Sequence, residues 1–225
     1  IFVSGEWNNK EVYSQWVSFS HEKDHNSFFA TLMNLCFGDE FTHFYLDQGE
    51  FFVSAIPSSA PIIVPSNVYW HNDAVIQMLP NAYVKYNLVL ILKSKNVTID
   101  GGVFIGDVKE HTGNEGEWGH GIKCSGASNI RLLNLTCKEF WGDGIDIIEA
   151  LDNNNEASIN CKNVTIKNVK SLYNRRQGLS IEAGSNIKIE DSEFAYTGQI
   201  KYTIPAAGID IEPCLIIKIK CGMCT

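Results

Sequence analysis

Basic side chains are scarce in this sequence. Its 225 residues include 18 Lys and Arg against 26 Asp and Glu, which gives a formal net charge of −8 at pH 7. A nucleic-acid partner requires a basic face that neutralises phosphates. We therefore expect no nucleic acid among the partners of this chain.

Long apolar runs and a regular cysteine framework are also lacking. No run reaches the ~20 apolar residues of a transmembrane helix, and the printed sequence shows no recognisable signal peptide. The seven cysteines lack the spacing of a disulfide scaffold. Cys124 and Cys137 stand at inward strand positions and are predicted to pack as small apolar groups. Cys221-Gly222-Met223-Cys224 is a single C-x-x-C, which is a weak zinc signal, and we predict no metal site there.

Two repeated phrases dominate the second half of the chain. The first covers residues 120–124, 143–147, 177–181 and 207–211, with glycine at its second position followed by Ile or Leu. The second reads Asn-(Val/Ile)-x-(Ile/Leu) and begins at Asn96, Asn129, Asn163 and Asn186, at spacings of 33, 34 and 23 residues. A period of about 20 to 50 residues indicates stacked structural repeats.

Each phrase alternates apolar and polar residues, which is typical of a β-strand. A third short run follows each Asn, so that one repeat has three strands and no helix. This pattern predicts an all-β fold, a single-stranded parallel β-helix (solenoid) in which neighbouring coils bury each other's inner faces. We expect the recurrent Asn to be a turn residue whose amide bonds its counterparts in adjacent coils. That structural role explains the Asn-x-Thr sequons at Asn96 and Asn163 better than glycosylation does.

The chain divides into three predicted parts. Residues 1–39 form an N-terminal segment with a short capping helix over 27–37, for which Ser27 is the expected N-cap and Gly38 the stop. Such a helix covers the open end of a stack of strands. Residues 40–213 form the β-helix domain. Residues 214–225 break the repeat, and a truncated or altered C-terminus is one interpretation of them.

Outward residues of the first phrase would form a column across the coils: Leu90, Lys123, Asp146, Ser180 and Asp210. Glu182 and Glu212 follow one step along. Because coils stack about 4.8 Å apart, Glu182 and Glu212 would lie at about the separation of a retaining carboxylate pair. Asp146 and Asp210, two coils apart, would lie near the upper limit for an inverting pair. The phrase glycines, with no side chain, are expected to leave a shallow groove for a sugar ring.

The connection that precedes each first phrase gathers further polar and aromatic residues. Tryptophans offer a flat face to a sugar, arginines pair with a uronate carboxylate, and a histidine can act as a general base. Ordinary structural roles are the alternatives: a turn at Asp143, edge caps at the tryptophans and surface ion pairs at the arginines. We predict a catalytic centre of Asp143, Asp146 and His120. The predicted substrate-binding residues are Trp118, Trp141, Arg175, Arg176, Glu117, Asp107, His111, Asp210 and Glu212.

Five motifs together resemble the pectate-lyase-like superfamily of right-handed parallel β-helices, in its bacterial, carbohydrate-active form. They are Gly106-Asp107 with His111, then the segments 117–122 (EWGHGI), 141–145 (WGDGI), 175–178 (RRQG) and 208–213 (GIDIEP). The resemblance covers about residues 40–213 and implies a right-handed β-helix. It does not specify the reaction, because that superfamily includes hydrolases, lyases, epimerases and non-catalytic phage or surface proteins. Gly119-His120-Gly121 matches the G-H-G motif of polygalacturonases, but their N-T-D motif and Asp pair are absent before it, so that mechanism is not carried over.

Three functions follow from these observations. The first is a secreted or cell-surface enzyme, a glycoside hydrolase or polysaccharide lyase acting on an acidic glycan. A lyase would neutralise the substrate carboxylate with Arg175 or Arg176, or with a Ca²⁺ ion held by Asp143, Asp146 and Asp210. The second is a non-catalytic glycan-binding module of the phage-tail or cell-surface type, and the third is an inactive structural fragment. The expected partner is a polysaccharide or oligosaccharide, and no oligomeric state is indicated.

Overall fold

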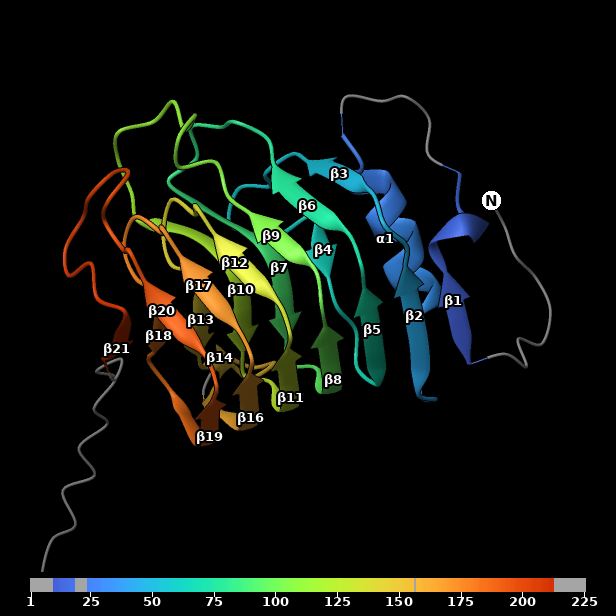
Figure 1. The fold of residues 1–225 in the computed structure, drawn as a ribbon. Coiled ribbons are helices and arrows are strands. Elements are labelled where there is room, and N and C mark those ends of the chain that lie inside the picture. Colours follow the sequence, from blue (N-terminus) through green and yellow to red (C-terminus); the bar gives the residue numbers. More distant parts are fainter. Residues whose placement is uncertain (1–9, 19–23, 156, 213–225) are drawn as a thin grey trace, which may run out of the picture.

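The computed structural model describes residues 10–18, 24–155 and 157–212. They form a parallel β-helix, as the repeats predict, in which each coil supplies one strand to each of three parallel sheets (Figure 1). The first phrase forms sheet I, with strands β4 (Ile62–Ile63), β7 (Lys85–Leu92), β10 (Trp118–Ser125), β13 (Ile145–Ile148), β18 (Leu179–Ile181) and β21 (Ile209–Ile211).

The Asn phrase forms sheet II, and the third run forms sheet III. Sheet II contains β1 (Glu11–Tyr13), β2 (Thr42–Leu46), β5 (Val68–Asn72), β8 (Lys95–Asp100), β11 (Ser128–Leu133), β16 (Cys161–Lys167) and β19 (Gly184–Glu190). Sheet III contains β3 (Glu50–Val53), β6 (Val75–Met78), β9 (Val103–Ile105), β12 (Thr136–Lys138), β17 (Lys170–Leu172) and β20 (Glu193–Ala195). A short antiparallel pair, β14 (Ala150–Leu151) and β15 (Ser158–Ile159), interrupts the repeat, and no sequence pattern indicated it.

Alternation along each strand decides what is buried. In β10 the inward Ile122 and Cys124 are fully buried, and their partners in β13, Ile145 and Ile147, are equally buried. Cys137 of β12 is also buried, which confirms the prediction for these thiols. The coils from β1 to β18 add such residues to one continuous apolar core, whereas Ile209 and Ile211 of the end strand β21 are exposed. Burial of that core is the main term that favours the stack.

The predicted asparagine ladder runs along the start of sheet II. The amide of Asn129 donates to the side-chain oxygen of Asn96 at 2.9 Å and accepts from the amide of Asn163 at the same distance. Asn67 and Asn186 extend the ladder at its two ends. These five asparagines have φ between 54° and 62°, a left-handed conformation that Asn tolerates better than most residues. The recurrent Asn is therefore a turn residue and an intercoil bond together.

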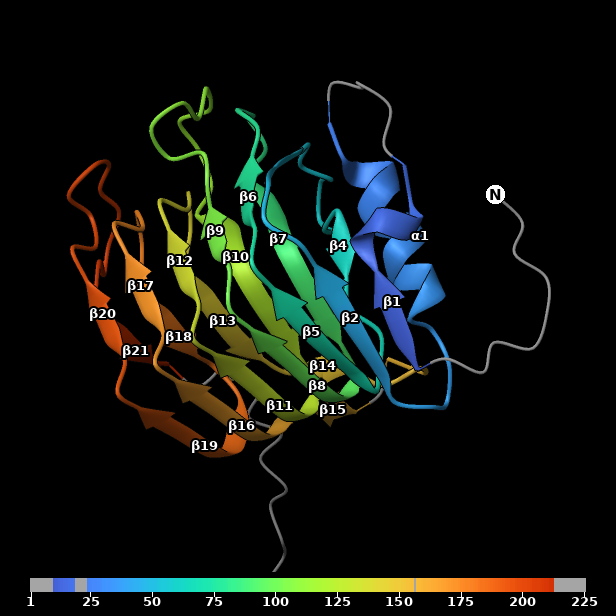
Figure 2. The same ribbon diagram turned by 45° about the vertical axis from the view of Figure 1, so that its right-hand side comes forward.

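Helix α1 (Asn26–Leu35) covers the N-terminal end of the stack beside β1, β2 and β4, as Figures 1 and 2 show. A one-turn 3₁₀ helix, η1 (Ser14–Trp16), follows the edge strand β1. The capping helix is confirmed, but Ser27 is not its N-cap, because the helix already begins after His25. No helix among the described residues is long and apolar enough to cross a membrane. Residues 213–225, with the C-x-x-C pair, lie outside the described residues.

Connections from sheet III to sheet I all lie along one long edge of the solenoid, at the top of Figures 1 and 2. The connection after β9 spans residues 106–117, and the one after β20 spans residues 196–208. This edge brings the predicted site residues of successive coils together.

Candidate functional site

The outward residues of sheet I form the column that the sequence predicts. Strand pairing places Lys123 beside Asp146, Asp146 beside Ser180, and Ser180 beside Asp210. Leu90 of β7 continues the column on the other side of Lys123. Asp146 and Asp210 therefore lie two coils apart on the same face.

Asp143, Asp146 and His120 come together at one point of this face. The Nδ1 atom of His120 lies 3.3 Å from Oδ2 of Asp143, and its Nε2 atom lies 3.7 Å from Oδ2 of Asp146. Both carboxylates are fully buried, and the His120 side chain is only 3 % exposed. The predicted catalytic centre is thus a real cluster, but its three members lie beneath other side chains.

Two cations cover the buried carboxylates. Nζ of Lys123 lies 2.6 Å from Oδ2 of Asp146. One guanidinium nitrogen of Arg176 contacts Asp143 at 3.0 Å, while another contacts Glu212 at 2.5 Å. Burial of a carboxylate is costly unless a cation or hydrogen-bond donors compensate it. Lys123 and Arg176 are therefore what keeps the acidic cluster stable in the fold.

His120 is held in its neutral form with a defined tautomer. Burial lowers its pKa from 6.5 to about 3, with the positive charges of Lys123 and Arg176 acting in the same direction. The backbone N–H of Asp143 donates to Nδ1 of His120 at 3.1 Å, so the ring proton is assigned to Nε2, on the side of Asp146. A ring with Nδ1 occupied and Nε2 protonated has no free lone pair for base catalysis. In this arrangement His120 positions Asp143 and Asp146 and does not fit the predicted role of general base.

Glu182 is only partly buried, and its pKa is strongly shifted. Partial burial and the negative charge of Asp146 raise its pKa from 4.5 to about 7, although Lys123 opposes that shift. Glu182 follows Ile181, whose partner in β21 is Ile211, so Glu182 and Glu212 leave adjacent strands at the same level. Asp143, in contrast, is fully enclosed, and burial followed by the charge of Asp146 raises its pKa, although Arg176 opposes the shift.

Some buried polar atoms of this face lack a hydrogen-bond partner in the described chain. They include Oδ1 of Asp143, Oδ1 of Asp146 and the hydroxyl of Ser180. Gln177 is also fully buried, and its amide donates to a carboxylate oxygen of Asp210. The floor of the site therefore has polar groups on consecutive coils, some with a hydrogen-bond partner and some without one.

Asp107, His111, Trp141 and Arg175 form a second cluster where the 106–117 connection packs against the connections of the next two coils. Asp107 accepts a hydrogen bond from the Tyr86 hydroxyl and contacts Nδ1 of His111 at 2.8 Å. The His111 ring stacks on Trp141 with centroids 3.9 Å apart, and the Arg175 guanidinium lies 3.8 Å from the Trp141 ring centroid. All four residues are at most 9 % exposed. They were predicted to bind substrate, but here they fasten the 106–117 connection to the stack.

The remaining predicted residues are more open. Trp118 is 47 % exposed at the start of β10. Side chains of Glu117 and Glu212 are 34 % and 44 % exposed and face Arg176 from two sides. Asp210 is partly buried next to Gln177. These positions, unlike the second cluster, are able to contact a ligand directly.

The phrase glycines do not leave the predicted groove. A Cβ atom on Gly144 would lie 2.0 Å from the Ser171 hydroxyl, and one on Gly121 would lie 2.4 Å from the carbonyl oxygen of Gly144. Packed atoms of the same and the next coil already fill the space that a side chain would need. These glycines are required for close approach within the stack, so the expectation of a sugar groove above them is wrong.

A calcium site at Asp143, Asp146 and Asp210 has little support in the geometry. Among the residues that the structure describes, no group of three His, Cys, Asp or Glu side chains is placed to hold a metal ion. Calcium prefers six to eight oxygen ligands, whereas Lys123 and Arg176 already contact the two buried carboxylates. The donor set fits an internal ion-pair network better than a cation site.

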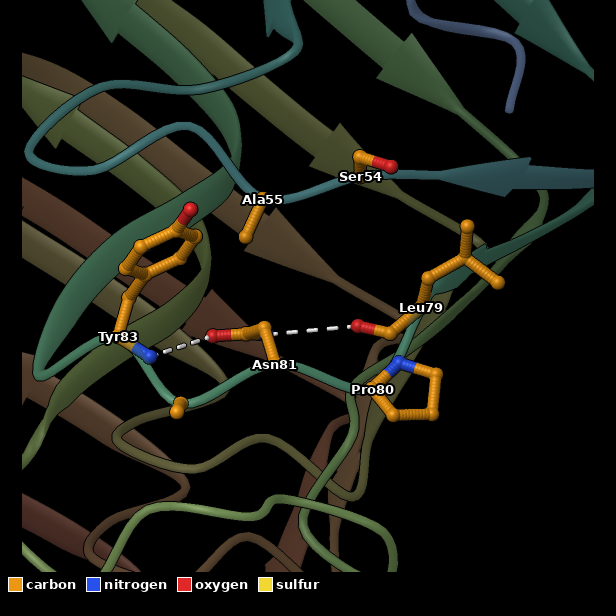
Figure 3. Close-up of a pocket in the computed structure, with 7 residues that line it drawn as sticks. Ser54, Ala55, Leu79, Pro80, Asn81 and Tyr83 are labelled. Carbon is orange, nitrogen blue, oxygen red and sulfur yellow. Dashed lines mark hydrogen bonds between the residues drawn. The ribbon is translucent and has the colours of Figure 1, made fainter. Parts of the chain in front are cut away.

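Two features of this edge had little or no sequence signal. Glu182 stood in the predicted carboxylate pair, but nothing in the sequence showed that its pKa would be shifted. A pocket of about 360 Å³ lies at the first two coils, lined by Ser54, Ala55, Leu79, Pro80, Asn81, Ala82 and Tyr83 (Figure 3). Its residues belong to connections that do not repeat, so periodicity could not find them.

Comparison with known proteins places these features in a wider group. A family model described as a right-handed beta helix region matches residues 55–216. The Bacillus subtilis (strain 168) protein YclG, which is uncharacterised, is 30 % identical over 162 residues, which are 68 % of this chain and 28 % of that protein. The uncharacterised YorA, derived from the SPbeta prophage of the same strain, is also 30 % identical over 162 residues, 67 % of this chain and 28 % of its own length. The chain thus spans little more than a quarter of the relatives that it matches.

A solved structure has the same fold at low sequence identity. It is a candidate glycosyl hydrolase from Parabacteroides merdae, with a TM-score of 0.58 and 13 % identity. The match covers 92 % of this chain and 98 % of that one.

Proposed function

Because this chain belongs to the right-handed β-helix family, we propose that its outward sheet I face is the reacting surface of a glycan-processing enzyme. The substrate is an acidic polysaccharide, and the enzyme works outside the cell or at its surface. The description of the Parabacteroides merdae structure as a candidate glycosyl hydrolase is in line with this proposal. The residues of the face supply the argument.

One observation carries the proposal. Carboxylates from consecutive coils line one face, and their surroundings separate their protonation states. Glycosidases need one carboxylic acid that keeps its proton near neutral pH and a second carboxylate nearby. Glu182, with its pKa at about 7, is able to donate a proton at neutral pH. Two carboxylates with different roles are thereby available on one surface.

Glu212 is the best second carboxylate for a hydrolase. It leaves the strand next to that of Glu182, and adjacent coils are about 4.8 Å apart, close to the separation in retaining glycosidases. Arg176, 2.5 Å from Glu212, stabilises its negative charge. In the proposed reaction Glu182 protonates the glycosidic oxygen as the bond to the leaving sugar breaks, while Glu212 attacks the anomeric carbon. A water molecule then gives a proton back to Glu182 and attacks the same carbon, which breaks the bond to Glu212 and releases the sugar. Lys123 and Arg176, although paired with carboxylates of the chain itself, add positive charge beside the site that favours an acidic substrate.

An activity screen against acidic polysaccharides tests this function. Reducing ends and the ultraviolet absorbance of unsaturated uronates are followed together on polygalacturonate, alginate and hyaluronan. Reducing ends alone support hydrolysis, whereas a parallel rise in absorbance supports a lyase on the same face. Glu182→Gln should reduce turnover at least about a hundredfold, the usual contribution of general acid catalysis. Glu193→Gln is the matched control, because Glu193 lies on β20 of the same coil but is exposed on sheet III.

A non-catalytic glycan-binding module is the second candidate. It is favoured by the burial of Asp143, Asp146 and His120, none of which has a side chain more than 3 % exposed. A binding module would retain polysaccharide affinity with no turnover and would keep that affinity in Glu182→Gln. Turnover that is lost in Glu182→Gln but kept in Glu193→Gln excludes this candidate.

A further inference from the structure

We infer that the pocket at the first two coils is a remote subsite that binds the far end of a long glycan chain held at the carboxylate face. This inference rests on the proposed function for the identity of the ligand. It adds a second place of contact on the same edge of the solenoid and makes chain length a determinant of affinity.

The pocket has the composition of a sugar-binding hollow. Its wall mixes apolar and polar groups, with Leu79, Pro80 and the ring of Tyr83, which is 45 % exposed, beside Asn81. Sugar rings have apolar faces that pack on such surfaces, and the phenol hydroxyl adds a polar contact at the rim. A volume of about 360 Å³ falls within the range of small-ligand sites.

The pocket is also rigid, which limits the entropy that binding would cost. Asn81 lies between Tyr83 and Leu79, and its side chain accepts from the Tyr83 backbone N–H at 2.9 Å (Figure 3). The Asn81 amide donates to Asp107 at 2.7 Å. The carbonyl of Asn81 further accepts from the backbone N–H of Thr112 at 2.9 Å. The pocket floor is thus fixed to the same 106–117 connection that borders the carboxylate face.

Two exposed apolar side chains lie on the path between the two places. Val84, next to Tyr83, is 45 % exposed, and its carbonyl accepts from the backbone N–H of Trp118 at 3.3 Å. Trp118 is itself 47 % exposed. Its neighbour Glu117 approaches Nε of Arg176 at 3.6 Å, which is the border of the carboxylate face.

Two lysines near the path offset the negative charge of Glu117 for an acidic chain. Lys85 lies beside Trp118 in the strand pairing of β7 and β10, and Lys123 follows on β10. From β7 to β18, the strand that Glu182 follows, the sheet advances three strands, which is roughly 14 Å. A ligand that reaches both the pocket and Glu182 must therefore be an oligomer and not a single sugar.

Binding to polyuronates of graded length tests the inference. Glu182→Gln protein is used so that no turnover interferes, and the probes are polygalacturonate, alginate and their size-fractionated oligomers. Affinity electrophoresis and calorimetry give the dissociation constants. Tyr83→Ala in this background should weaken binding of the polymers by about three- to tenfold, as expected for loss of one aromatic contact. The affinity for the shortest oligomers that still bind should be unchanged.

Phe37→Ala is the matched control, because Phe37 is 81 % exposed but lies beyond the end of α1, outside the path. Three outcomes would overturn the inference. Tyr83→Ala could weaken the binding of short and long glycans equally, it could weaken neither, or the protein could bind neither polyuronate. Turnover is not a readout here. If the protein binds long glycans more tightly than short ones but has no activity, the proposed reaction is contradicted and the subsite is still supported.

Discussion

Glu182 acquires its behaviour from its neighbours in space and not from its neighbours in sequence. Burial and the charge of Asp146 raise its pKa to about 7, while Lys123 lowers it. If Glu182 is the proton donor, turnover should be maximal below about pH 7 and fall as the pH rises through that value. Asp146→Asn removes a negative charge, so the alkaline limit should move to lower pH. The pH dependence of kcat on the substrate found in the screen measures this shift, and a shift to higher pH would contradict the assignment.

His120 couples its burial to the pH dependence of stability. Its pKa is about 3 in the folded chain and about 6.5 when exposed, so only the unfolded state binds a proton between these values. Stability should therefore fall as the pH drops from about 6.5 towards 3, by at most about 1.4 kcal/mol per pH unit from this residue. His120→Asn removes the titrating group. Urea unfolding of both proteins between pH 7 and pH 4 should show a shallower acid loss in the variant, and parallel curves would refute this account.

The elements of the fold follow from sequence because one coil resembles the next. Alternation in segments such as 143–147 and 177–181 fixes which residues face inward, and the recurrence of the two phrases in each coil fixes the register. Both were correct. The expectation of a glycine groove was wrong because the side chains of Ser171 and Asn174 fill the space beside Gly144, which no local pattern reveals.

The site was less predictable than the strands. Spacing brought Asp143, Asp146 and His120 together correctly, since all three lie on repeated phrases. Burial of Trp141 was missed, because it depends on how the non-repeating 106–117 connection folds back over it. Protonation states and the Tyr83 pocket also arise from such tertiary contacts.

Asn129 tests the ladder as an element. Asn129→Ala removes two amide bonds, each worth about 0.5–1.5 kcal/mol, and places Ala at a φ of 56°. The left-handed conformation adds about 1–2 kcal/mol for a residue with a Cβ atom. We expect a total loss of about 2–5 kcal/mol in urea unfolding. Asn129→Gly, which loses the bonds but adopts that φ freely, should lose less, and equal losses would mean that the backbone conformation contributes nothing.

On the scale of the whole molecule, the solenoid is a row of coils in which each contacts mainly its neighbours. Stability then depends on how the ends of the row are closed. At the N-terminal end α1 covers the first coil, and its Phe29 is fully buried against Phe28 and Phe51. The catalytic proposal depends on this closure too, because the pocket and the carboxylate face keep their spacing only while every coil between them is in place.

Phe29→Ala should open that end. Loss of a fully buried phenylalanine costs about 3–5 kcal/mol, and a loosened helix would expose apolar side chains and strand edges that pair with other chains. We therefore expect a lower urea midpoint together with concentration-dependent association in sedimentation velocity. Phe37→Ala, at a side chain that is 81 % exposed two residues beyond the helix, should change stability by no more than about 0.5 kcal/mol and remain unassociated. If Phe29→Ala lost stability but stayed unassociated, the helix would serve only the core, and the edge strands would be protected by another part of the chain.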